Sequence, residues 1–119
     1  MSSAILNVTF DCRDAESVAT FWSAVTGYSI EKVESPGNTY WVVAAGDGAW
    51  PRLVFVTVPE AKVVKNRVHL DIVPAGDDQE AEVRRLTSLG AHIVDDRRKL
   101  EPGGWVVMAD PEGNEFCVE

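Results

Sequence analysis

The stretch that decides the fold is RVHLDIV, at residues 67–73. Its residues alternate between apolar and polar types: Val68, Leu70 and Ile72 against Arg67, His69 and Asp71. Successive side chains of a β-strand point to opposite faces, so the pattern predicts a strand with one packing face and one polar face. The polar face holds an imidazole beside a carboxylate. We therefore interpret His69 and Asp71 as candidate catalytic or ligand-binding residues.

The same alternation appears near the N-terminus, over residues 4–12: Leu6, Val8 and Phe10 interleave with Asn7, Thr9 and Asp11. Each alternating strand leads into a predicted helix. The first helix covers residues 15–26, because Asp14 suits an N-cap, apolar residues recur at helical spacing and Gly27 suits the position past the end. The second begins at Asp77, with Glu80 at capping-box spacing, and ends at Gly90.

The remaining predicted strands cover residues 28–34, 40–44 and 53–58 in the first half, and 91–95, 105–109 and 115–119 in the second. Residues 59–66 are predicted to connect the halves, and residues 96–104 to form a loop. Pairs of residues then match at a nearly constant offset of 62 to 64: Asn7 with His69, Gly27 with Gly90, Trp41 with Trp105, and Phe55 with Cys117. A constant offset indicates duplication. We predict an α+β fold of two tandem βαβββ modules, residues 1–58 and 67–119, within a single domain, 1–119.

Composition narrows the partners and the compartment. The 119 residues include 19 Asp and Glu against 11 Lys and Arg, a net charge of −8. Nucleic acids and anionic membranes both require a basic face, so neither is expected as a partner. Cys12 and Cys117 form no CxxC pair, and no basic signal segment or long apolar run is present. These features predict a reduced, cytoplasmic protein without a membrane span.

Alternation also predicts which side chains line a site between the halves. We expect the helices to cover Val54, Val56, Phe116 and Val118. The opposite faces then present Asn7, Thr9 and Asp11, Leu53, Phe55 and Thr57, His69 and Asp71, and Glu115, Cys117 and Glu119. Apolar walls with a few polar groups are typical of a small-molecule pocket. The predicted ligand-binding residues are Asn7, Thr9, Trp41, Phe55, His69, Trp105 and Cys117.

Several segments of the chain resemble the vicinal oxygen chelate superfamily, in its glyoxalase-like and bleomycin-resistance-like branch. They are Asp11-Cys12-Arg13-Asp14, the segment from Phe21-Trp22 to Gly27, the run KNRVHLD at 65–71, and DPEGNEFC at 110–117. The resemblance implies paired βαβββ modules that form a U-shaped cleft, as in glyoxalases, bleomycin-resistance proteins and dioxygenases. It also implies that a homodimer is one assembly to expect.

In the metal-dependent members of that superfamily, His, Glu or Gln side chains from the first and last strands of each module hold a divalent ion. The resemblance places these positions at Asn7, Phe55, His69 and Cys117. Only His69 is a standard ligand, and His plus Cys falls short of the three or four ligands that such a site needs. We therefore predict that the usual metal site is largely lost and that no cofactor is bound.

Three functions remain open at this point. The first is a metal-independent protein that binds a small, partly aromatic or cationic molecule, as the drug-binding members of the family do. The second is a lyase or isomerase that uses His69 and Asp71 for proton transfer. The third is an enzyme with a different metal-ligand set, such as His69, Asp71 and Glu119.

Overall fold

A computed structural model describes residues 1–100 and 103–119. It divides into two compact units, Met1–Ala61 and Lys62–Glu119. The loop predicted at 96–104 includes residues 101 and 102, which lie outside the described residues. Within the described ranges, no helix combines the length and the apolar composition needed to cross a bilayer.

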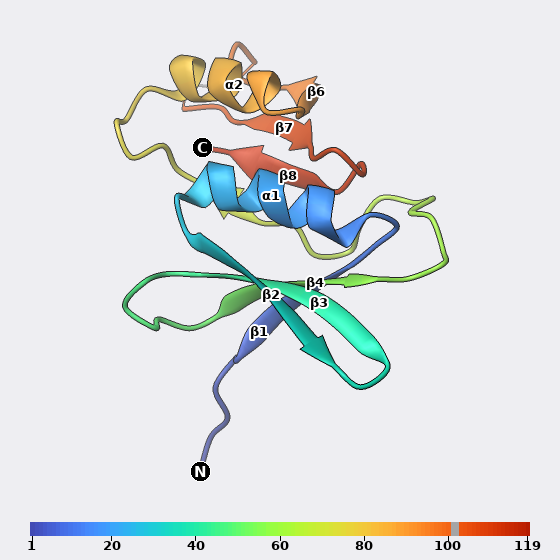
Figure 1. Ribbon diagram of the computed structural model, residues 1–119. Coiled ribbons are helices and arrows are strands. Elements are labelled where there is room, and N and C mark those ends of the chain that lie inside the picture. Colours follow the sequence, from blue (N-terminus) through green and yellow to red (C-terminus); the bar gives the residue numbers. More distant parts are fainter. Residues whose placement is uncertain (101–102) are drawn as a thin grey trace. The chain divides into compact units, whose positions relative to one another are not determined.

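The first unit is a four-stranded mixed sheet with one helix on one face (Figure 1). Strand β1 pairs in parallel with β4, while β3 runs antiparallel to both β4 and β2, giving the order β1-β4-β3-β2. The elements are β1 (Asn7–Cys12), α1 (Ala15–Thr26), β2 (Ser29–Ser35), β3 (Asn38–Ala44) and β4 (Arg52–Thr57).

The second unit repeats this connectivity with the strand order β5-β8-β7-β6, and α2 packs against β6 and β8 (Figure 1). Its elements are β5 (Asp71–Ile72), α2 (Gln79–Ser88), β6 (His92–Asp96), β7 (Val106–Ala109) and β8 (Glu115–Val118). Two sheets of identical topology, each with one helix, confirm the predicted α+β fold and its tandem βαβββ order.

The helix ends show which capping predictions were correct. Helix α1 has the predicted bounds: the Asp14 carboxylate accepts the Ser17 N–H at 3.2 Å, and Gly27 takes the left-handed conformation, with φ of 73°. The predicted start of α2 is wrong by one residue. Asp78 is its N-cap and accepts the Ala81 N–H at 3.0 Å, so Glu80 does not complete a capping box.

The predicted facing of β4 is wrong. Phe55 is the cross-strand partner of Phe10, so the two side chains share a face. Their rings stack at 4.9 Å, and Phe10 also contacts Trp22 of α1 at 5.9 Å. Phe55 therefore packs on the α1 side of the sheet, whereas Val54 and Val56 share the opposite face with the β1 residues Thr9 and Asp11.

The strand predicted at 67–73 is also wrong in its extent. Only Asp71 and Ile72 pair with β8, and residues 62–70 form an irregular segment. Val68, predicted to lie on the packing face of that strand, is 77% exposed. Residues 67–73 alternate as a strand does, but the exposed Val68 gains nothing from burial. Side-chain hydrogen bonds, described below, hold this segment in place instead.

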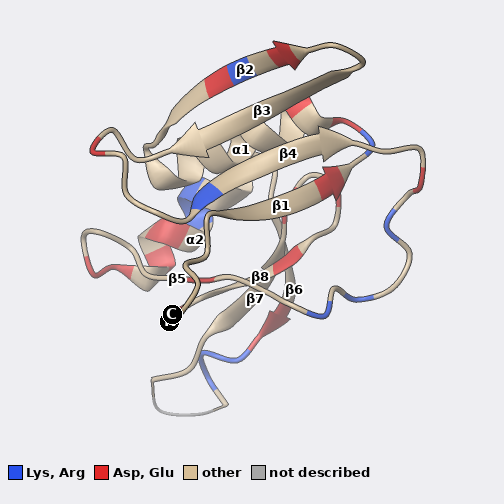
Figure 2. Ribbon diagram, turned by 90° about the horizontal axis from the view of Figure 1, so that it is seen from below, with Lys and Arg blue, Asp and Glu red and all other residues tan. Residues whose placement is uncertain are grey.

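Charged residues mark the edge of the first sheet. Strand β2 is an edge strand and carries charges of both signs (Figure 2). They belong to Glu31, Lys32 and Glu34, and Lys32 and Glu34 form an ion pair at 3.3 Å. Charges on an edge strand disfavour pairing with a strand of another chain. This edge is therefore protected against open-ended sheet extension.

Candidate functional site

Three chemically reactive side chains meet on one face of the second sheet: His69, Asp71 and Cys117. Asp71 and Cys117 are partners in the parallel β5–β8 pair, and the Cys117 N–H donates to the Leu70 carbonyl at 2.9 Å. His69 Nε2 lies 3.3 Å from Asp71 Oδ1, and one potential ligand atom from each of the three residues lies within 4.8 Å of the others. The structure thus brings together three of the residues singled out from sequence.

The members of this cluster differ in exposure. The side chains of His69 and Asp71 are 42% and 53% exposed, while Cys117 is 7% exposed. Burial raises the pKa of the Cys117 thiol above its ordinary value of 9.0, and the negative charges of Asp71 and Glu119 add to the rise, with Lys65 opposing it. The cluster therefore offers an accessible imidazole–carboxylate pair beside a thiol that stays protonated at neutral pH.

Cys117 is expected to react with iodoacetamide only at unusually high pH, because the thiolate is the reactive form. The midpoint of the pH–rate profile should lie above 9.0, and Asp71→Asn should lower it, so that alkylation at pH 9 becomes faster. Because the folded-state pKa is raised, the stability that the protonated thiol contributes is present below about pH 9 and is lost as the pH rises through the folded-state value.

Peptide-level mass spectrometry separates Cys117 from Cys12 in this measurement. Glu31→Gln, which removes an exposed carboxylate from β2 in the other unit, is the matched control and should leave the rate unchanged. A profile identical to that of the denatured chain would contradict the assignment of Cys117 to a buried, electronegative site.

Glu119 enters this site through its charge rather than as a member of the cluster. The His, Cys, Asp and Glu group that the described residues bring within ligand distance contains Cys117 and not Glu119. The Glu119 N–H donates to the Ile72 carbonyl at 2.9 Å, which fixes the backbone beside β5. The ligand set considered from sequence, His69, Asp71 and Glu119, thus becomes His69, Asp71 and Cys117.

The predicted residues of the first unit fall on two faces. Asn7 and Thr9 lie on the face of β1 opposite Phe10, and Asn7 Oδ1 accepts Arg52 Nε–H at 2.9 Å. Phe55 is fully buried. Trp41 is its cross-strand partner and shares the α1 side of the sheet, with the Lys32 ammonium 5.9 Å from its ring centre. Phe55 and Trp41 therefore do not line the same face as Asn7 and Thr9.

Trp105 lies just before β7, in the second unit. The Arg97 guanidinium sits 5.9 Å from its ring centre, and the Trp105 carbonyl accepts the Arg97 N–H at 2.9 Å. Its ring contact is thus with the segment that follows β6. Trp105 also lies two residues before Val107, the cross-strand partner of Cys117, so alternation places it on the same side of the sheet as Cys117.

Sequence reasoning missed the residues that anchor the segment before His69. Asn66 and Lys62 both bind Glu115, at the start of β8: Asn66 N–H donates to Glu115 Oε1 at 3.1 Å, and Lys62 Nζ lies 3.0 Å from the same oxygen. Burial raises the pKa of the Glu115 carboxyl, but these hydrogen bonds outweigh burial and hold the pKa below its ordinary value. The sequence feature that could have pointed to Asn66 is its position in the run KNRVHLD, at residues 65–71.

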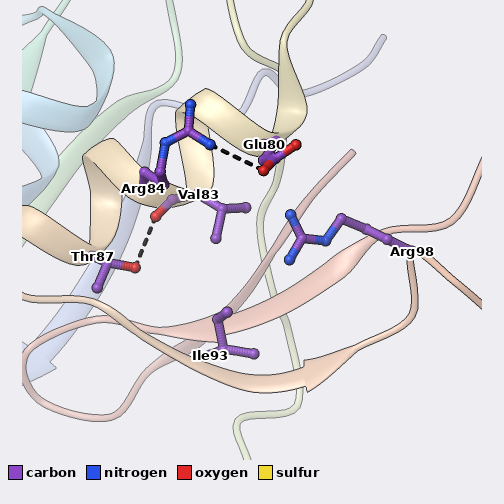
Figure 3. Close-up of a pocket in the computed structure, with 6 residues that line it drawn as sticks. All are labelled: Glu80, Val83, Arg84, Thr87, Ile93 and Arg98. Atoms are coloured by element: carbon purple, nitrogen blue, oxygen red, sulfur yellow. Dashed lines mark hydrogen bonds and ion pairs between the residues drawn. The ribbon is translucent and has the colours of Figure 1, made fainter.

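A second candidate is a surface pocket of about 320 Å³ between α2 and β6 (Figure 3). Its charged groups already have partners, since Arg84 pairs with Glu80 at 3.1 Å and Arg98 pairs with Asp96 at 2.6 Å. A charged ligand would have to displace an existing ion pair there. The cluster around His69 is therefore the better candidate. The pocket is lined by Glu80, Val83, Arg84, Thr87, Ile93 and Arg98.

The repeated βαβββ topology, with reactive groups on the first and last strands of a unit, defines a protein of the vicinal oxygen chelate class. The chain matches the family model described as "Glyoxalase-like domain" over residues 7–119, and it belongs to that family. No curated protein matches it significantly by sequence.

Solved structures share the fold at low sequence identity. FosX, the fosfomycin resistance protein of Mesorhizobium loti, superposes with a TM-score of 0.71 at 17% identity, covering 100% of this chain and 92% of its own. A FosX variant from Listeria monocytogenes, complexed with Mn(II) and a dihydroxypropylphosphonic acid, gives 0.77 at 10% identity, covering 100% and 93%. Leishmania major glyoxalase I gives 0.68 at 15% identity, covering 98% and 86%.

The observed register changes one of the four metal positions that the resemblance implies. If His69 corresponds to Asn7, then Asp71 corresponds to Thr9. Asp71 pairs with Cys117, whereas Thr9 pairs with Val54, so Val54 and not Phe55 is the counterpart of Cys117. Valine has no ligand atom, and the single amide oxygen of Asn7 already accepts a hydrogen bond from Arg52. The first unit thus offers no strong metal ligand at either position.

Proposed function

We propose that this protein binds a small, partly aromatic or cationic molecule, and that His69 and Asp71 recognise it without a bound metal. The observation that carries the proposal is the 3.3 Å contact between His69 Nε2 and Asp71 Oδ1, with both side chains about half exposed and the Cys117 thiol beside them. An ion pair this exposed contributes little to the stability of the fold, so a purely structural role gives little reason for the pair. A ligand could reach both groups directly.

The chemistry of the pair suits a ligand with a positive group. The Asp71 carboxylate attracts a cation, and the imidazole of His69 can donate or accept a hydrogen bond according to its protonation. The net charge of −8 favours the approach of cations over anions. These arguments support a cationic or neutral ligand in preference to an acidic one.

A metal-dependent enzyme is the second candidate, and one observation favours it: imidazole, carboxylate and thiol donors lie within 4.8 Å of one another. Three such ligands with one open position match a catalytic zinc site. The thiol suits zinc better than Mn(II), which prefers oxygen ligands. In such an enzyme, His69, Asp71 and Cys117 would hold an ion that polarises an oxygen of the substrate.

Proton transfer without metal is the remaining enzymatic alternative. The Asp71 carboxylate lies where it can orient the imidazole of His69 as a general base for a lyase or isomerase reaction. The raised pKa of Cys117 argues against the thiol as a nucleophile, because little thiolate is present at neutral pH.

Binding of benzamidine, an aromatic cation, tests the main proposal. NMR titration should show saturable shifts centred on His69 and Asp71, and His69→Ala should weaken binding about tenfold, near 1.4 kcal/mol. His92→Ala is the matched control, since His92 is the other histidine of the chain and is exposed on β6. Shifts absent from this cluster, or equal losses in both variants, would contradict the proposal.

Metal analysis of protein purified without chelators separates the first two candidates. Less than about a tenth of a divalent ion per chain, with no tight zinc binding on titration, is expected for the metal-free protein. Stoichiometric zinc that Cys117→Ser releases would instead establish the metal-dependent alternative.

The partner and compartment predictions remain proposals. We expect neither nucleic acid nor a membrane surface as a partner, because the chain is strongly acidic. Both cysteines are thiols rather than a disulfide, which supports the reducing cytoplasm as the compartment. The homodimer implied by the resemblance stays a prediction.

A further inference from the structure

The position of His69 requires an explanation, because no strand holds it. The pairing of β5 with β8 covers only Asp71 and Ile72, and the last backbone bond toward His69 is the one from Cys117 N–H to the Leu70 carbonyl. Val68, on the other side of His69, is 77% exposed, so apolar packing does not fix the backbone there. Another interaction must hold the segment against β8.

The Asn66 side chain supplies that interaction. Its Oδ1 accepts the Glu115 N–H at 2.7 Å, and its Nδ2 donates to the Glu115 carbonyl at 3.3 Å. One side-chain amide thus joins both backbone groups of Glu115, as the N–H and C=O of a single residue do in a hydrogen-bonded pair of an antiparallel sheet. The same Nδ2 also donates to the Val68 carbonyl, next to His69. Asn66 therefore ties the residue before His69 directly to the first residue of β8.

Asparagine fits this role better than its nearest relatives. Both Nδ2 hydrogens and the Oδ1 acceptor are used, so every polar atom of the amide has a partner. Aspartate would keep the acceptor, lose both donors and place a second carboxylate beside Glu115. Glutamine would set the amide one methylene farther from the backbone of residue 66, out of register with the N–H and C=O of Glu115. The requirement is thus for the Asn amide at this distance from the backbone.

We propose that Asn66 is the positioning residue of the site: its amide clamps Val68 to β8 and thereby holds His69 opposite Cys117. This role rests on the proposed function only in so far as His69 contacts the ligand. The Lys62–Glu115 ion pair anchors the same segment farther from His69, and a charged contact on a lysine side chain fixes the backbone less closely than a bidentate amide does.

Asn66→Ala tests the proposal through a readout that needs no ligand. The wild-type protein should show a nuclear Overhauser contact between the His69 ring and the Cys117 β protons, and slow exchange of the Cys117 amide. Asn66→Ala should abolish the contact and speed that exchange tenfold or more, with the amides of α1 unchanged. Asn66→Asp should do the same, which guards against attributing the effect to a lost side-chain volume.

Lys62→Met is the matched control, because it removes the other anchor of the segment and leaves the amide clamp. It should keep the contact between His69 and Cys117. If Asn66→Ala keeps that contact, or if Lys62→Met loses it equally, Asn66 is not the positioning residue. If the contact is lost in Asn66→Ala while wild-type protein fails to bind benzamidine at this cluster, the positioning role stands and the proposed function fails.

Discussion

Asp110→Ala is expected to lower the free energy of unfolding by about 3–4 kcal/mol, one of the largest losses from a single polar side chain in this protein. Asp110 is fully buried in the turn that joins β7 to β8. Its Oδ1 accepts the N–H groups of Glu112 at 2.9 Å and Asn114 at 3.0 Å, and its Oδ2 accepts Asn114 Nδ2 at 2.9 Å. Alanine would leave these donors without their acceptor in a site that water cannot easily refill.

Thermal and urea unfolding would measure this loss, which corresponds to a fall in Tm of roughly 10–20 °C. Asp47→Ala is the matched control, since the Asp47 carboxylate also accepts a backbone N–H, that of Ala49 at 2.9 Å, but in an exposed turn. Water can replace that bond, so the control should lose less than about 1 kcal/mol. Equal losses in the two variants would show that burial of Asp110 does not set its contribution.

Asp110→Asn separates the shape of the side chain from its charge. The amide oxygen can still accept both backbone N–H groups, but the new NH₂ group faces the Asn114 amide that the carboxylate bound. An intermediate loss of about 1–2 kcal/mol is therefore expected. A full loss would mean that the negative charge, and not the pattern of acceptors, stabilises the turn.

Local signals made the first helix predictable. Asp14 and Gly27 mark its two ends, and its apolar residues recur at a single helical spacing, so no tertiary contact was needed to find its bounds. The pairing of His69 with Asp71 was also readable from the sequence, because two residues separated by one share a strand face. Alternation in the sequence therefore predicts that an imidazole and a carboxylate lie together in the site.

Long-range contacts account for what the sequence did not reveal. Asn66 binds Glu115, 49 residues later, and no local pattern encodes that amide-to-backbone contact. The same contact explains why a stretch that alternates like a seven-residue strand contains only two residues of β5. The segment does not need a full ladder to stay in place, because one side chain substitutes for it.

The sequence did not indicate which side of the sheet each side chain of β4 takes, and the reason is different. β4 lies between β1 and β3, and its consecutive residues Leu53, Val54 and Phe55 are all apolar and all buried. A run without alternation gives no signal for which face each side chain takes. Only the register with β1, which pairs Phe55 with Phe10, decides it.

Phe55→Ala gives that register a measurable consequence. Phe55 is fully buried and stacks on Phe10, so the truncation should leave a cavity beneath α1 and cost about 3–5 kcal/mol, a fall in Tm of roughly 10–25 °C. A residue that lined an open pocket would behave differently. Its truncation would change ligand binding and keep the free energy of unfolding within about 1 kcal/mol of wild type. Urea unfolding followed by tryptophan fluorescence reports the change, because Phe10 also contacts the Trp22 ring.

Two further variants make the result specific to the buried ring. Thr57→Ala alters the same face of β4 at an exposed position and should stay within about 0.5 kcal/mol of wild type. Phe55→Leu keeps most of the apolar volume and should cost about 1–2 kcal/mol, less than alanine, if cavity volume sets the loss. A Phe55→Ala protein as stable as Thr57→Ala would mean that Phe55 does not face α1, and the register between β1 and β4 would then have to shift by one residue, which would return Phe55 to the face that carries Asn7 and Thr9.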